Sequence, residues 1–161
     1  MPLIPKGTAR IDARYGAYAA ALLSDTGGLT QFGGFIETLL PGSASSTLHW
    51  HEKEDEMVHV LTGTVTLFAS EAQTPMYPGD TACFKAAPPV GHCMRNDSDP
   101  SASYMVVSTR SGNDDVTYQL TGDTLTIRDG IKTYRDANGT VTRTTTISRR
   151  MTMPPPPKAT G

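Results

Sequence analysis

The chain has 161 residues, a formal net charge of -2 at pH 7, and hydrophobic side chains at 37% of its positions. This length fits one globular domain with a sizeable core, and the near-neutral charge, with basic residues scattered rather than clustered, argues against nucleic acid as a partner. No apolar run is long enough to span a bilayer. The N-terminus has neither the apolar core nor the cleavage pattern of a secretory signal, so we expect a cytoplasmic protein with Cys83 and Cys93 as free thiols.

Residues 1–30 predict a peripheral N-terminal arm. They are Ala-rich before a turn cluster at 24–28, and either a short amphipathic helix or an extended segment would fit. From Leu29 onward, short runs of strand formers alternate with Gly and Pro, without a sustained helical period. This change of pattern predicts an all-β body over residues 31–120.

Seven strands are expected in that body, because turn residues such as Pro41-Gly42 and Pro78-Gly79-Asp80 separate them. Short strands at this spacing are typical of an antiparallel sandwich or barrel. The expected strands cover residues 35–40, 47–51, 57–61, 64–70, 81–85, 92–96 and 104–109.

The C-terminal part predicts two further features. Within residues 121–150, the dipeptide Asn138-Gly139 separates two strand-like runs, 131–135 and 140–147, which favours a C-terminal hairpin. Residues 151–161 contain four consecutive prolines, which cannot join a sheet ladder, so this segment is expected to be a disordered tail.

The segment STLHWHEKEDEMVHVLTG, residues 46–63, concentrates most of the histidines of the chain. Alternate side chains of a strand share a face, so His49 and His51 would point the same way, about 7 Å apart. If residues 52–55 turn the chain back, Glu56 faces the same cavity, whereas His59 lies on the opposite face as a packing or interface residue. Two imidazoles and a carboxylate could then meet at one metal ion, with Glu52, Glu54 and Asp55 as a solvated turn.

The spacing of this segment resembles the first motif of the cupin superfamily, HxHx4Ex6G, in which His49, His51, Glu56 and Gly63 occupy the fixed positions. A second motif is expected to follow as a PG turn, a strand, a bend and HxxxN.

This second motif is supplied in order by Pro78-Gly79 and by residues 91–96, GHCMRN, with His92 as its histidine. The bend departs from the usual pattern, because Lys85 and Ala87 stand where the family has Pro and Gly. The resemblance covers residues 35–110. It implies an antiparallel cupin β-barrel, or double-stranded jelly roll, in which His49, His51, Glu56 and His92 bind one divalent transition metal such as Fe, Mn, Ni or Zn.

Four ligands on an ion that accepts six leave positions open to a small oxygenated substrate. The resemblance therefore implies a metal-dependent enzyme, with either dioxygenase-type oxidative cleavage or non-redox isomerase or lyase chemistry. A non-catalytic sensor of a small ligand or metal, and a purely structural site, are the alternatives. Glu56 is the candidate general base, or else a permanent ligand, and Tyr104 is a second catalytic candidate if its hydroxyl enters the cavity rather than the core.

Small cupins commonly pair through the outer faces of their strands. Apolar or aromatic side chains are expected on those faces here, which favours a homodimer. They are Phe32, Phe35, Met57, His59 and Leu61.

Overall fold

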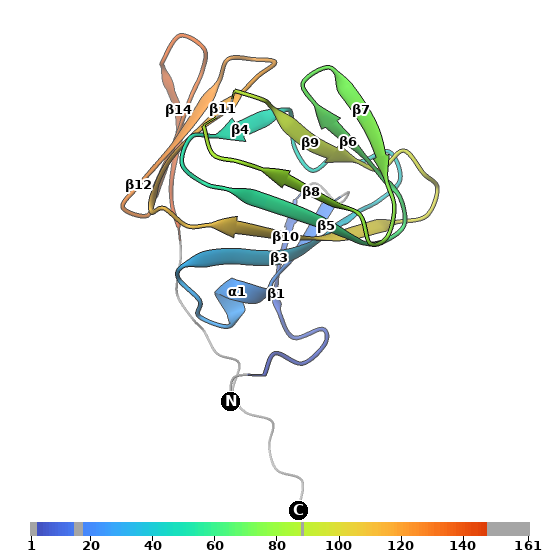
Figure 1. Cartoon of the computed structure of the whole chain (residues 1–161). Helices are drawn as coiled ribbons and strands as arrows, with labels where there is room; N and C mark the ends of the chain where they lie inside the picture. The colour runs from blue at the N-terminus through green and yellow to red at the C-terminus, as the bar shows by residue number, and fades with distance from the viewer. Residues whose placement is uncertain (1–2, 15–17, 88, 148–161) are drawn as a thin grey trace, which may run out of the picture.

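The computed structural model describes residues 3–14, 18–87 and 89–147 and consists of two antiparallel sheets (Figure 1). The smaller sheet has six strands in the order β1-β2-β3-β10-β5-β8. Their bounds are β1 Arg10–Arg14, β2 Tyr18–Leu22, β3 Phe32–Leu39, β10 Ala102–Thr109, β5 Glu56–Thr62 and β8 Thr81–Phe84. A four-residue helix, α1 (Leu23–Thr26), connects β2 to β3, and no helix among the described residues is long and apolar enough to cross a membrane.

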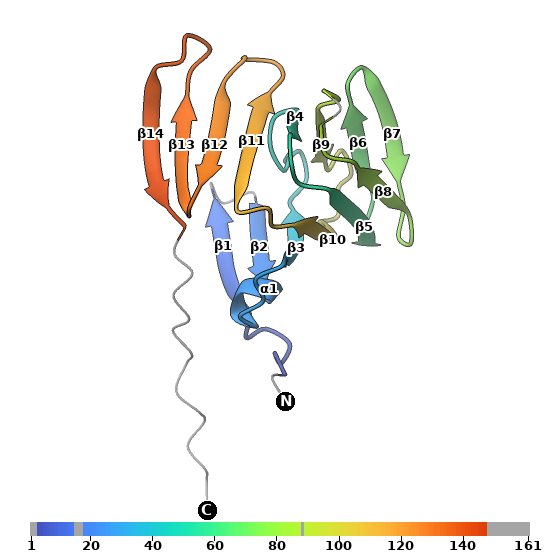
Figure 2. The same ribbon diagram turned by 60° about the vertical axis from the view of Figure 1, so that its left-hand side comes forward.

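The larger sheet has eight strands in the order β14-β13-β12-β11-β4-β9-β6-β7. Figure 2 shows strands β11 to β14 side by side at one end of this sheet, beyond β4. The bounds are β14 Val141–Thr146, β13 Ile131–Arg135, β12 Thr124–Arg128, β11 Asn113–Tyr118, β4 His49–His51, β9 His92–Arg95, β6 Val65–Ala69 and β7 Ala72–Met76.

The core lies between the two sheets and follows from strand alternation. In β5, Val58 and Val60 are buried, and they pair across β10 with the buried Val106 and Tyr104. The larger sheet contributes to the same cluster from β6, β7 and β9, including Met94. Because inward and outward positions alternate strictly, the residue at the start of β5, Glu56, faces the interior like Val58 does.

The expected all-β antiparallel fold is confirmed, and each of the seven expected strands corresponds to an observed one. Beyond these, residues 1–30 contribute β1 and β2, and β2 pairs with β3 as part of the smaller sheet. The hairpin at the C-terminal end is present as β13 and β14. The sequence predicts a peripheral arm rather than sheet strands at β1 and β2, and it does not predict β7, β11 or β12. The Pro-rich tail at 151–161 lies outside the described residues.

Candidate metal centre

Three histidines come together on the inner face of the larger sheet. His49 and His51 occupy alternate positions of β4, and His49 is the register partner of His92 in the neighbouring strand β9. The ring centroid of His49 lies 5.3 Å from that of His51 and 4.9 Å from that of His92. Strand parity and cross-strand pairing thus bring together residues that are far apart in the sequence.

Glu56 reaches this histidine cluster from the opposite sheet. The Nε2–H of His92 donates to Oε1 of Glu56 over 3.2 Å, and both side chains are largely buried. Two adjacent ligands of a metal at about 2.1 Å, arranged at a right angle, would lie about 3 Å apart. The separation of these two donor atoms therefore fits a pair of neighbouring ligands.

The rings of the two β4 histidines are oriented through their Nδ1 atoms. Nδ1 of His49 lies 3.0 Å from the Ser46 hydroxyl oxygen and 3.1 Å from the Thr47 carbonyl. Nδ1 of His51 lies 2.6 Å from a carboxylate oxygen of Asp114. With Nδ1 held by the protein in each case, Nε2 is the nitrogen that either ring can offer to a metal.

His92 is held differently, by stacking rather than by a hydrogen bond at Nδ1. The Phe84 ring lies parallel to it, with centroids 3.7 Å apart and planes 3° apart. Its Nδ1 is buried without a hydrogen-bond partner among the described residues, so the polar contact of this ring is the one with Glu56. Three imidazoles and one carboxylate form a donor set suited to a divalent transition metal, and these residues fit the group that the cupin resemblance implies.

Burial sets the protonation states that a metal requires. It lowers the pKa of His49 to about 4, and the neighbouring His92 and His51 act in the same direction. Burial alone would raise the pKa of Glu56, but the hydrogen bond from His92 and the nearby imidazoles outweigh it and lower that pKa. At neutral pH the centre therefore holds a neutral His49 and an ionised Glu56, both able to donate electron pairs.

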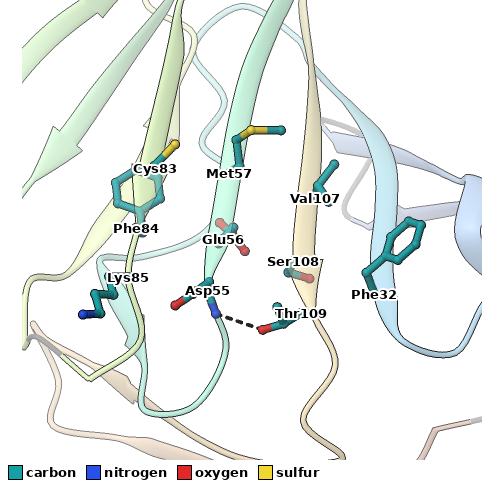
Figure 3. A pocket seen from close by; sticks show the side chains of 10 residues that line it. All are labelled: Phe32, Asp55, Glu56, Met57, Cys83, Phe84, Lys85, Val107, Ser108 and Thr109. Atoms are coloured by element: carbon teal, nitrogen blue, oxygen red, sulfur yellow. Dashed lines mark hydrogen bonds between the residues drawn. The ribbon is translucent and has the colours of Figure 1, made fainter.

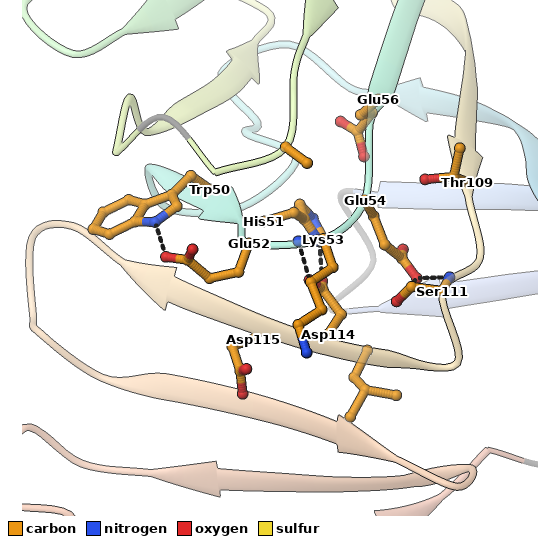
Figure 4. Close-up of polar contacts among 12 residues, drawn as sticks. Trp50, His51, Glu52, Lys53, Glu54, Glu56, Thr109, Ser111, Asp114 and Asp115 are labelled. Atoms are coloured by element: carbon orange, nitrogen blue, oxygen red, sulfur yellow. Dashed lines mark hydrogen bonds and ion pairs between the residues drawn. The ribbon is translucent and has the colours of Figure 1, made fainter.

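A second acidic group adjoins this cluster and shares one of its histidines. Potential ligand atoms of His51, Glu54 and Asp114 lie within 4.8 Å of one another (Figure 4). Each of these side chains, however, already has a hydrogen-bond partner in the protein. Asp114 accepts from His51 and from the Lys53 backbone N–H, and Glu54 accepts from the Ser111 backbone N–H. Direct hydrogen bonds account for this group without an ion.

The remaining acidic residues of the turn, Glu52 and Asp55, are exposed, as expected for a solvated turn, and they also accept hydrogen bonds. Glu52 accepts from the Trp50 indole, and Asp55 accepts from the Ala86 backbone N–H. Burial raises the pKa of Glu54, although the bond from Ser111 opposes this. The turn is fastened to three neighbouring segments, so it fixes where β5 begins and hence where Glu56 stands.

Tyr104 does not join the cluster, and its expected role as a catalytic residue is corrected. It pairs with Val60, whereas Glu56 pairs with Ser108, four residues along β10, or about 13 Å. The Tyr104 hydroxyl donates to Glu37, and burial together with that carboxylate raises the tyrosine pKa well above its ordinary value. Tyr104 is thus a core tyrosine, as the alternative interpretation held.

A cavity of about 380 Å³ lies against β3, β10, β5 and β8 (Figure 3). Its lining includes Met57, Cys83 and Val107, register neighbours that face away from the barrel interior because Val58 and Val106 face into it. Phe32 completes this apolar surface, whereas Phe35, expected on the same outer face, packs against the core. His59, on the outer face as expected, contacts Thr81.

Two facing antiparallel sheets, with a three-histidine, one-glutamate cluster between them, define a β-barrel of the jelly-roll class with a candidate metal centre. The chain belongs to the cupin superfamily. The Cupin domain family matches residues 35–108, which includes all four clustered residues, and no curated protein matches the chain.

Solved structures agree with this assignment. A sugar phosphate isomerase of the cupin superfamily from Silicibacter pomeroyi is 36% identical, with a TM-score of 0.67 over 79% of this chain and 76% of that one. A putative sugar phosphate isomerase from Acidithiobacillus ferrooxidans is 26% identical, with a TM-score of 0.75 over 86% of this chain and 94% of that one. A predicted oxalate decarboxylase from Thermotoga maritima, 17% identical with a TM-score of 0.58 over 67% of this chain and 98% of that one, shares the fold.

Proposed function

We propose that this cupin is a metal-dependent, non-redox isomerase of small hydroxy-carbonyl compounds of the sugar or sugar phosphate class. The observation that carries the choice between redox and non-redox chemistry is the 36% identity to the sugar phosphate isomerase from Silicibacter pomeroyi. The metal ligands in this proposal are His49, His51, Glu56 and His92, whose donor set suits Fe, Mn, Ni or Zn.

The metal would supply Lewis-acid polarisation of the substrate carbonyl. The chain itself would supply the proton transfer that moves a carbonyl between two adjacent carbons. Glu56 is the candidate base, because its carboxylate is ionised at neutral pH and lies within 3.2 Å of His92 in the histidine cluster. It would take the proton from the hydroxyl-bearing carbon and return it to the neighbouring carbon, while the hydroxyl proton passes to the former carbonyl oxygen, so that no external oxidant is required.

Residues around the centre restrict what can enter it. The Phe84 ring covers one face of His92, and the next inward-facing positions along β5 and β10 are the buried Val58 and Val106. Among the described side chains, every Lys and Arg is exposed or half-buried, so a phosphate group would be expected to remain near the mouth while the hydroxy-carbonyl end enters. Short-chain substrates are therefore favoured.

The test is proton exchange from solvent. Protein stripped of metal and reloaded with Fe(II), Mn(II), Ni(II) or Zn(II) is incubated in D2O with aldose and ketose substrates, each with and without phosphate. We expect at least one metal to give the isomeric sugar, with deuterium at the carbon next to the carbonyl. Glu56→Gln should slow this exchange by about 10²-fold or more, whereas Glu54→Gln, a matched change just outside the cluster, should retain it.

Three results would count against the proposal. Oxygen uptake with cleavage of the carbon chain would indicate dioxygenase chemistry instead. A saturable thermal shift without turnover would indicate a sensor. Exchange at the wild-type rate in Glu56→Gln would show that Glu56 is not the base, even if the protein is an isomerase.

A further inference from the structure

One buried carboxylate close to the candidate centre belongs to neither cupin motif. Asp114 lies on β11, outside the matched residues 35–108, and its side chain is fully buried. Strand β11 pairs with β4, which brings Asp114 to His51 although 63 residues separate them in the chain. An ionised carboxylate in such a position requires hydrogen-bond donors, because burial without them is costly.

Both oxygens of this carboxylate have defined donors. Oδ2 lies 2.6 Å from Nδ1 of His51, and Oδ1 accepts the backbone N–H of Lys53 over 2.9 Å (Figure 4). An ionised carboxylate can only accept hydrogen bonds, so the imidazole must carry its proton on Nδ1. The lone pair of His51 is then on Nε2, the atom that a metal would use.

We propose that Asp114 is the positioning residue of this site, which fixes the tautomer and the ring orientation of His51 so that Nε2 is presented to the metal. The inference rests on the proposed metal centre, and it adds a residue that the cupin motifs do not contain. It also gives β11, a strand beyond the two cupin motifs, a role in the site, because Asp114 on this strand contacts His51.

A second contact of the same strand region supports this role of β11. The side-chain oxygen of Gln119, directly after β11, accepts the backbone N–H of Gly91 over 3.1 Å, one residue before His92. The Gln119 backbone N–H also bonds to the carbonyl of Leu48, one residue before His49. The same segment therefore fastens the backbone beside two further candidate ligands.

The test uses Asp114→Asn, which keeps the acceptor for the Lys53 N–H and replaces only the atom that faces His51. An amide nitrogen donates to Nδ1 and therefore favours the opposite tautomer, with the proton on Nε2. In the metal-free protein at alkaline pH, ¹⁵N NMR should detect the Nδ1–H form of His51 in the wild type and its loss in the variant. His51→Gln identifies the signal.

The second readout is metal affinity, measured by chelator competition with Ni(II) and Mn(II). Asp114→Asn should weaken binding about 10- to 100-fold, the usual effect of losing such a partner. Asp115→Asn is the matched control on the same strand, because Asp115 bonds to Arg128 rather than to a histidine, and it should bind like the wild type.

An unchanged tautomer in Asp114→Asn would overturn the proposal, and so would an unchanged metal affinity. Failure of the proposed function would look different. If the wild type binds metal without isomerase activity, both readouts still test Asp114. If the wild type binds no metal, the metal centre fails, and the tautomer alone decides whether Asp114 orients His51.

Discussion

His92 and Glu56 stand on different sheets of the barrel, yet the imidazole Nε2 lies 3.2 Å from the carboxylate Oε1. This contact joins the two sheets at the candidate centre. At this distance the two groups either share a proton through a hydrogen bond or bind one metal as neighbouring ligands. The fold thus places two of the four proposed ligands side by side.

Glu56→Gln separates the role of base from that of ligand. The amide keeps the shape and one oxygen donor but loses the negative charge, so we expect metal affinity to fall about tenfold. With the metal saturated, kcat should still fall by about 10²- to 10⁴-fold, the usual contribution of a general base. Steady-state kinetics at several metal concentrations measure both effects. A kcat that recovers fully at high metal would mean that Glu56 is only a ligand.

The low pKa of His49 predicts an acid-dependent loss of stability in the metal-free protein. The folded pKa is about 4 and the ordinary value is 6.5, so as pH falls the unfolded chain takes up this proton first. The stability from neutral His49 is therefore complete above pH 6.5 and is lost as pH falls toward 4, with a slope of up to about 1.4 kcal/mol per pH unit.

The pKa values of other groups at the centre are also shifted, and these groups affect the stability of the folded protein in different pH ranges. Burial lowers the pKa of His51, but the Asp114 hydrogen bond and the charges of the nearby carboxylates together outweigh it and raise that pKa, so the stability it contributes is present below pH 6.5 and is lost as pH rises through the raised value. Glu56 has a lowered pKa, and its contribution is lost only below its ordinary 4.5. Between pH 6.5 and 4.5 Glu54, whose pKa burial raises, acts in the opposite direction to His49, so the His49 contribution is the difference in urea unfolding between the wild type and His49→Gln, in which the loss on acidification should be smaller. An equal slope in that variant would contradict this assignment.

Gly63, the last residue of the first motif, is expected to resist substitution for a steric reason. Its φ is +71°, and a Cβ there would lie 2.8 Å from the Cα and Cβ of Ala102. Gly63→Ala should cost about 2 kcal/mol or more of the free energy of unfolding. Gly112→Ala is the control, since its φ of +75° is similar but no atom lies within 4 Å. Equal losses in the two variants would show that backbone strain alone, rather than the contact, sets the cost.

The outer face of the smaller sheet is the expected homodimer surface. The cavity beside Met57 and a second apolar cavity under α1 share Phe32 and Val107, so the apolar surface is continuous. Light scattering at micromolar concentration should give a dimer mass for the wild type and a monomer mass for Met57→Glu. Ile131→Glu, at an exposed apolar position on the other sheet, should remain dimeric. A monomeric wild type would contradict the dimer.

The alternation of side chains along a strand was sufficient to predict which side of the sheet each residue of the first motif faces. His49 and His51 share a face because they are two residues apart, and the buried Val58 and Val60 place Glu56 inward. Parity says which side of a sheet a residue faces but nothing about its depth along the strand. Tyr104, for example, shares the inward face of β10 with Val106, but it lies four residues from Ser108, the register partner of Glu56.

Long-range pairing explains most of what sequence reasoning missed. Asp114 meets His51 only because β11 pairs with β4, and no local pattern specifies that pairing. The strand β7 was missed because Pro75 interrupts its run, yet β7 is an edge strand of its sheet, where proline is tolerated. The Ala-rich β2 lacks the usual strand formers and becomes a strand through pairing with β3.

The central claim is that His49, His51, Glu56 and His92 bind one metal ion. Because His51 also belongs to the neighbouring group with Glu54 and Asp114, the decisive measurement is the metal content of His92→Gln and Glu54→Gln beside the wild type, by elemental analysis of folded protein. The account predicts close to one metal per chain in the wild type and in Glu54→Gln, and strong loss in His92→Gln. Full metal content in His92→Gln together with loss in Glu54→Gln would contradict it.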